Sequence, residues 1–190
     1  MGKTSPPERR ELLALLRQQP RGRANQHRER IETLIQAIER SQPADLSDPT
    51  TQELLEGVWE LRWSSSKQPY LTVAPWLENL QGLAPSQGKG VNLLRLPGPL
   101  GAVAGIAVEA ELALDPDRAQ RVQVRFRRGG WLGPSLGGRR LQWLQSVQQS
   151  FPAWLDITVV DRELRICRGN AGTLFALLRR PELEIDQLID

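Results

Sequence analysis

Residues 155–178 read LDITVVDRELRICRGNAGTLFALL and contain three short apolar runs. The pair Asp161-Arg162 separates the first two runs, and the glycine-containing segment 169–172 separates the last two. Runs of this length that are rich in β-branched and aliphatic residues, with turn residues between them, are typical of strands joined by tight turns. The segment therefore predicts a three-stranded antiparallel meander.

Apolar and polar residues alternate strictly in three earlier segments, which are residues 58–64, 106–114 and 121–127. Alternation with a period of two indicates strands with one buried face, and the turn signal at Asp115-Pro116-Asp117 joins the last two as a hairpin. With further strands near 89–96 and 140–147, the total reaches about seven or eight, as in small barrels and sandwiches. A closed barrel is favoured because closure removes exposed strand edges.

Two helices are predicted before the first strand. Residues 8–18 are strong helix formers that end before Pro20 and Gly22, and a second helix can begin at Asn25 and end before Pro43. The second helix carries one apolar stripe, formed by Ile31, Leu34, Ile35 and Ile38. We predict a mainly β fold with N-terminal α-helices: a helical segment at 1–48, a β-barrel domain at 49–182 and a tail at 183–190.

Residues 54–66 and residues 154–175 carry motifs that resemble those of the plastid lipid-associated (PAP/fibrillin) family. Residues 54–66, LLEGVWELRWSSS, are similar to the opening strand of that family, and residues 154–175 are similar to its closing hairpin. The resemblance implies an antiparallel lipocalin-like β-barrel and a non-enzymatic protein that binds or carries a quinone, tocopherol, carotenoid or acyl lipid. It also implies association with thylakoid membranes or lipid bodies.

The apolar residues of the alternating strands are the candidate lining of one ligand cavity. Burial of an apolar molecule in such a cavity gains roughly 25 cal/mol per Å² of surface removed from water. The alternation leaves open whether the interior is hollow or filled with side chains. The candidate lining residues are Trp59, Leu61, Trp63, Val108, Leu112, Val124, Phe126, Ile157, Leu164, Ile166 and Phe175.

Arg168, Asp161 and Arg165 are the candidate polar groups, with a structural role or a contact to the head group of a ligand. By alternation Arg168 shares the face of Leu164 and Ile166, where an unpaired charge would be costly. We therefore expect it to stack over Trp59 or to pair with Asp161.

Two tryptophans are candidates for a lid over the barrel mouth. Trp76 and Trp131 lie in segments 75–90 and 129–140, which are rich in Pro, Gly and Ser and are predicted to be long loops. The alternative is that both side chains fold back onto the core.

No catalytic or metal-binding set is evident in the sequence. His27 is the only histidine, and Cys167 is the only cysteine, predicted to be an inert thiol on the polar face of its strand. The short glycine segments do not match a phosphate-binding loop. We predict no enzymatic activity, no metal and no cofactor.

The excess positive charge lies at the N-terminus, where residues 1–40 hold nine Lys or Arg against five Asp or Glu. This asymmetry suggests a peripheral membrane or lipid-body surface as partner, although a solvated helix would also explain it. A structural coat on lipid surfaces is therefore an alternative to a carrier. A nucleic-acid binder is a remote alternative, because the aromatic residues alternate inward and do not form a stacking platform.

Neither an apolar run long enough for a membrane-spanning helix nor a transit peptide is visible. Together with the resemblance to the PAP/fibrillin family, whose plant members would need an import segment, this implies a cyanobacterial protein that is cytoplasmic or peripherally associated with thylakoids. The sequence leaves the oligomeric state open.

Overall fold

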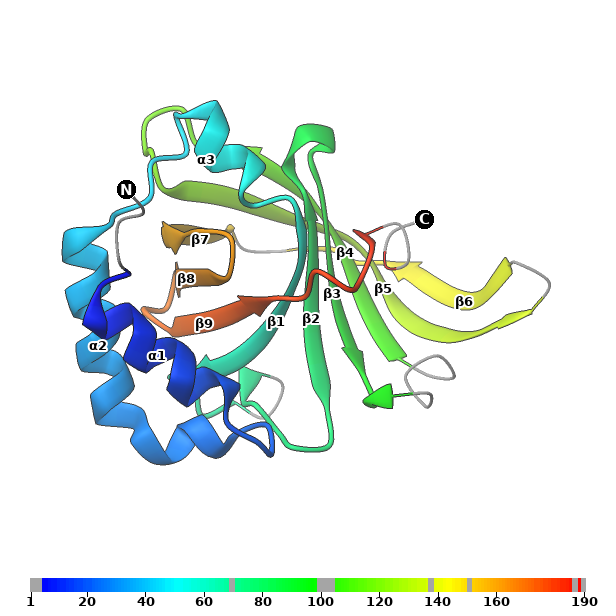
Figure 1. Cartoon of the computed structure of the whole chain (residues 1–190). Coiled ribbons are helices and arrows are strands. Elements are labelled where there is room, and N and C mark those ends of the chain that lie inside the picture. Colours follow the sequence, from blue (N-terminus) through cyan, green and yellow to red (C-terminus); the bar gives the residue numbers. More distant parts are fainter. Residues whose placement is uncertain are drawn as a thin grey trace.

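The computed structural model describes residues 5–68, 71–98, 105–136, 139–149, 152–185 and 188. Within them, three α-helices precede nine strands (Figure 1). The helices are α1 (Pro7–Arg17), α2 (Arg28–Ser41) and α3 (Pro49–Glu53). The strands are β1 (Gly57–Ser64), β2 (Glu78–Ala84), β3 (Lys89–Arg95), β4 (Gly105–Leu114), β5 (Arg121–Leu136), β6 (Arg139–Ser146), β7 (Ala153–Val160), β8 (Leu164–Gly169) and β9 (Leu174–Arg179).

The strands form a closed antiparallel ring. Their hydrogen-bonded order is β4-β3-β2-β1-β9-β8-β7-β5-β6, and the additional pairing of β4 with β5 closes eight strands into a ring. Among the described residues β6 pairs only with β5, and together they form a ribbon that projects away from the ring (Figure 1). The structure confirms the predicted fold class, an antiparallel barrel-like sheet preceded by a helical hairpin.

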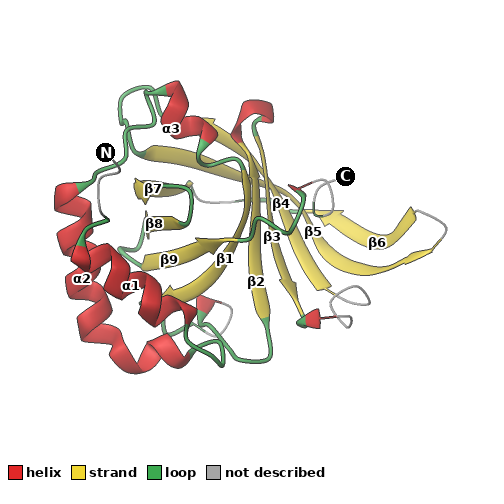
Figure 2. Ribbon diagram, in the orientation of Figure 1, coloured by secondary structure: helices red, strands yellow, loops and turns green. Residues whose placement is uncertain are grey.

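The helical hairpin of α1 and α2 covers the outer face of one side of the ring (Figure 2). The apolar stripe of α2 packs with Leu12, Leu13 and Leu16 of α1 against the outward side chains of β1, β7, β8 and β9. These strands therefore bury apolar residues on both faces. The strand residues in this outer cluster are Trp63, Val159, Leu164, Ile166, Leu174 and Ala176.

The interior of the ring holds a second cluster of apolar side chains. Trp59 and Leu61 of β1 meet Ile157 of β7, Cys167 of β8 and Leu177 of β9 there. A third cluster lies on the outer face of β1 to β5. Gly82 of β2 belongs to that outer face, since a Cβ at this position would lie 3.3 Å from Leu188 of the C-terminal segment.

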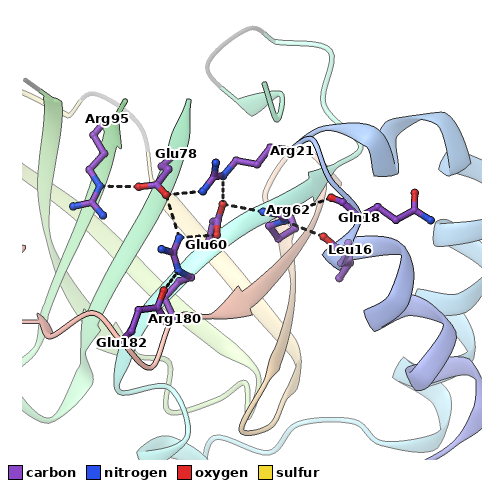
Figure 3. A network of polar contacts seen from close by, with 9 residues as sticks. All are labelled: Leu16, Gln18, Arg21, Glu60, Arg62, Glu78, Arg95, Arg180 and Glu182. Carbon is purple, nitrogen blue, oxygen red and sulfur yellow. Dashed lines mark hydrogen bonds and ion pairs between the residues drawn. The ribbon is translucent and has the colours of Figure 1, made fainter. Parts of the chain in front are cut away.

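A buried network of charges joins the segment after α1 to β1, β2, β3 and the segment after β9 (Figure 3). Glu60 and Glu78 are 4% and 3% exposed. Arg21, Arg62 and Arg180 donate to Glu60, while Arg95 donates to Glu78 at 2.9 Å. Burial alone would raise the pKa of Glu60, but the surrounding guanidinium groups lower it below its usual value. The outward residues of β1 are therefore not solvated, contrary to what their polarity suggests.

Two segments that the sequence predicted as loops are strands. In β2, Glu78, Leu80, Gly82 and Ala84 share the buried face, and the Glu and Gly interrupt the apolar alternation that would reveal a strand. The second half of β5 contains Gly133 and Pro134, where the register with β6 shifts between Leu132 and Ser135. A proline is tolerated in a strand at such an irregularity.

Candidate functional site

An apolar pocket of about 50 Å³ opens into the ring beside α3. Its wall is aliphatic except for two polar side chains, Gln81 and Arg165. Leu114 at its rim is 37% exposed and Arg165 is 1% exposed, so the pocket runs from solvent to a buried end. The lining residues are Leu55, Gln81, Leu83, Pro85, Leu112, Leu114, Val122, Val124, Leu155, Ile157 and Arg165.

Alternation explains how several strands contribute to this wall. Leu112 and Leu114 of β4 pair with Val124 and Val122 of β5, and register partners in a sheet share a face. Because the ring is closed, the inward residues of β2, β7 and β8 face the same space. The volume suffices for several small atoms, since one water needs about 10–15 Å³ on this measure.

Trp59 is fully buried in the interior cluster near this pocket. Its indole Nε1 donates to the carbonyl of Leu55 at 2.9 Å. The Cζ atoms of Arg179 and Arg165 lie 4.4 Å and 5.2 Å from the ring centroid. Arg179 donates to the carbonyls of Glu56 and Leu54, so its guanidinium is held by backbone oxygens and an aromatic ring.

Arg165 is the polar group at the buried end of the pocket. Its Nη2 donates to Oε1 of Gln81, whereas its Nε and Nη1 are buried and have no hydrogen-bond partner among the described residues. Burial lowers the pKa of Arg165, and Arg179 nearby acts in the same direction. Guanidinium groups stay protonated in proteins, so the interior contains positive charge.

The PAP_fibrillin family model matches residues 8–178 of the chain. The chain belongs to the PAP/fibrillin family. The match extends over the helical hairpin and all nine strands up to Leu178, and it confirms the resemblance seen at residues 54–66 and 154–175. PAP/fibrillin proteins are a lipid-associated family, and the barrel-like fold described above is compatible with lipid association.

No curated protein matches this PAP/fibrillin chain. Among solved structures, it is similar to a streptavidin-like protein from Bacteroides eggerthii DSM 20697, with 11% sequence identity and a TM-score of 0.42. That alignment covers 66% of this chain and 79% of the other.

The predicted lining residues of this PAP/fibrillin ring lie in the pocket, in the adjoining interior cluster and outside both. Leu112, Val124 and Ile157 line the pocket, and Trp59, Leu61 and Phe175 belong to the adjoining interior cluster. Val108 and Phe126 are half-buried residues outside both sets. Whether any of them contacts a ligand stays a prediction.

Trp63, Leu164 and Ile166 do not face the interior, contrary to the expectation. They pack against α1 and α2 on the outer face. For Trp63 the cause is a shift of register between Leu61 and Trp63 in the pairing of β1 with β9. For β8, the period of two identified which residues share a face but not which face points inward.

The predicted partners of Arg168 are also corrected. Arg168 lies on the outer face of β8, where its Nε donates to Oε1 of Glu39 in α2 at 2.8 Å. Asp161 pairs with Arg9 of α1 instead, with 2.7 Å between Oδ2 and Nε. Both ion pairs fasten the helical hairpin to the ring, which no local sequence pattern indicates.

Cys167 is 1% exposed and lies in the interior cluster, so the expectation that it faces the polar side is wrong. Its predicted inertness is compatible with this position, because burial raises the pKa of the thiol. Arg165 lies two residues before Cys167 on β8 and shares its inward face. The alternating pattern of β8 would have placed Arg165 inward only if the opposite face had been known to pack against the helical hairpin.

The two lid candidates have different positions. Trp76 is 64% exposed in the connection between β1 and β2, as predicted for a loop residue. Trp131 is 44% exposed but lies on β5, opposite Ile106 of β4 and Trp143 of β6. The prediction of a loop around Trp131 was wrong because Gly and Pro in this ribbon hide its strand character.

Ile106, Trp131, Leu141, Trp143 and Val147 form an exposed apolar surface, which we call the ribbon face. Trp143 is 70% exposed. A Cβ at Gly129 would lie 3.4 Å from Val147 and 3.5 Å from Val108, so the ribbon face adjoins the inward side of β4. Of these five residues, only Trp131 was a candidate site residue from the sequence.

Among the residues that the structure describes, no group of His, Cys, Asp and Glu is arranged to hold a metal ion. None of the described helices is long and apolar enough to span a membrane.

Proposed function

We propose that this PAP/fibrillin protein binds one small hydrophobic molecule in its ring and carries it at or near a thylakoid membrane or lipid body. The molecule is an isoprenoid quinone, a tocopherol, a carotenoid or an acyl lipid. The observation that supports the proposal is the pocket, which has an aliphatic wall, a rim at Leu114 and a polar buried end. Apolar sites with a few polar groups that orient the ligand are typical of binding proteins.

The size of the pocket restricts how such a ligand is held. About 50 Å³ accommodates only a few non-hydrogen atoms, so most of a long molecule extends past the rim. A carrier of this kind exposes part of its cargo and releases it readily to a lipid surface. This fits a protein that works beside membranes and does not need to enclose the whole ligand.

The test is native mass spectrometry and organic extraction of the protein purified from a photosynthetic host. A lipid that co-purifies at near one per chain supports the carrier and identifies its cargo. The variant Val124→Phe fills the pocket and is expected to lose the lipid, whereas Gln123→Phe, on the outward face of the same strand, retains it. A wild-type protein that is reproducibly empty contradicts the proposal.

The ribbon face favours a second function, a coat on lipid surfaces. Exposed Trp and Leu side chains on one side of a projecting ribbon, next to Ile106 of β4, suit insertion into the boundary between head groups and acyl chains. An empty protein that still co-sediments with lipid vesicles would support this second function over the first.

A further inference from the structure

We infer that the ligand of the pocket is a single-chain amphiphile with a carboxylate head, and that Arg165 binds this head. The inference rests on the proposed carrier function and specifies its ligand class. It begins with Arg165, which is 1% exposed, lines the pocket and leaves Nε and Nη1 without hydrogen-bond partners among the described residues. A buried cation without an ion pair is costly unless an anion joins it.

The charge around Arg165 is not balanced within the ring. The neighbours of its guanidinium are the amide of Gln81, the ring of Trp59 and the thiol of Cys167, whose pKa burial raises, so none of them carries a negative charge at neutral pH. The nearby guanidinium of Arg179 bonds to backbone carbonyls. Neither arginine forms an ion pair within the described part of the chain, in contrast to Arg9, Arg62, Arg168 and Arg180.

Neutral ligands do not resolve this imbalance. A quinone or tocopherol oxygen, or a buried water, can accept a hydrogen bond from a guanidinium group, but each leaves the positive charge uncompensated. A carboxylate accepts the hydrogen bond and also neutralises one charge. The anion is therefore the best match to the polar end of the pocket.

The shape of the pocket limits the ligand to one chain. A volume of about 50 Å³ with an aliphatic wall admits a carboxylate and a few methylene groups, but not the bulk of a two-chain phospholipid head. The chain then leaves along Leu112 and Leu114 at the rim. An unesterified acyl chain has this combination of one charge and one tail.

The experiment measures binding of dodecanoic acid, methyl dodecanoate and a decyl-substituted benzoquinone to the full chain by calorimetry below their aggregation limits. We expect the acid to bind about tenfold or more tightly than the ester, since hydrogen bonds to charged groups are stronger than neutral ones. Equal binding of all three overturns the carboxylate assignment but keeps the carrier function. No binding of any probe overturns both.

Variants assign the preference to Arg165. Arg165→Met keeps an apolar contact to Trp59 and is expected to bring acid and ester within about twofold of each other, while Arg165→Lys retains part of the preference. The matched control is Arg168→Met on the outer face of the same strand, which keeps the wild-type preference. If Arg165→Met still prefers the acid as the wild type does, Arg165 is not the binding residue. The wild-type comparison of acid with ester decides the ligand class even if a variant fails to fold.

Discussion

The guanidinium of Arg179 lies over the indole ring of Trp59, with 4.4 Å between its Cζ and the ring centroid. The two residues are register partners on β9 and β1, so the contact lies where the last strand pairs with the first, which we call the seam. Arg179 also reaches the carbonyls of Leu54 and Glu56. The first and the last strand are thereby joined by side chains as well as by their backbone ladder.

Removal of the Trp59 ring is expected to destabilise the protein strongly. Trp59→Ala creates a cavity in the interior cluster and removes the surface on which two guanidinium groups lie. The expected loss of unfolding free energy is about 3–5 kcal/mol, as for other large buried side chains. Urea unfolding measures it, with Trp143→Ala at the exposed ribbon face as control and an expected change below about 0.5 kcal/mol. Similar losses in both variants would contradict the burial of Trp59.

Gly57 precedes this seam and is expected not to tolerate a side chain. It has φ +120°, and a Cβ there would lie 2.7 Å from Nη1 of Arg179. Gly57→Ala should lose about 1–3 kcal/mol from backbone strain, and more because Arg179 must move off Trp59. Gly172→Ala is the matched control, since Gly172 also has positive φ but no atom within 4 Å of a Cβ. Thermal unfolding compares them, and an equal loss in both would show that Arg179 is unaffected.

The ion pair between Asp161 and Arg9 is expected to make stability depend on acid pH. Burial alone would raise the pKa of Asp161, but Arg9 and the amides of Glu163 and Leu164 lower it below 3.8. Because the pKa of Asp161 is lower in the folded protein than in the unfolded chain, the ionised carboxylate stabilises the fold at pH values above its unfolded pKa. This contribution is lost as the pH falls through the folded pKa.

Asp161→Asn should therefore be less stable than wild type by about 1–2 kcal/mol at pH 7. The gap should be full at pH values above the unfolded pKa of Asp161 and should narrow as the pH falls below it. Urea unfolding over this range measures it. Glu11→Gln, which removes an exposed pair with Arg30, is the control and should cost less. A gap that is constant with pH would mean that the carboxylate charge of Asp161 does not stabilise the fold.

The ribbon face is expected to mediate binding to lipid surfaces. Trp143→Ser removes its most exposed aromatic ring without disturbing a buried cluster, so vesicle co-sedimentation should fall several-fold while the melting temperature stays the same. Trp76→Ser is the comparison, because Trp76 is similarly exposed but lies outside this surface. Equal losses in the two variants would assign binding to exposed tryptophans in general and not to the ribbon.

The sequence predicted those elements whose pattern is local. The alternation of β1, β4 and the first half of β5, the short apolar runs of β7 to β9 and the stripe of α2 identify strands and a helix, because each pattern lies within one segment. The pattern fails where burial has another cause. In β2 a buried Glu is neutralised by arginines from three distant segments, and in β5 a glycine-rich ribbon is stabilised by pairing with β6.

The candidate site was predictable only in part, for the same physical reason. Leu112, Val124 and Ile157 follow from alternation, but the inward face of β8 does not, since the helical hairpin makes its outer face equally apolar. Arg168 thus lies on the outer face, contrary to the expectation, while Arg165 lines the pocket. Only the packing of α2 on β8 distinguishes them.

The seam between β1 and β9 also has a consequence for how the protein is made. Trp59 pairs with Arg179, a residue 120 positions later, and such distant pairings are slow to form. During translation β9 leaves the ribosome after the other eight strands. The apolar stripe of α2 packs against β7 to β9, so it cannot be fully buried until these strands have been synthesised. A nascent chain that lacks this last strand therefore displays an open interior, an unpaired strand edge and a bare helical face at once. These are the features that chaperones recognise and that promote aggregation when synthesis is interrupted.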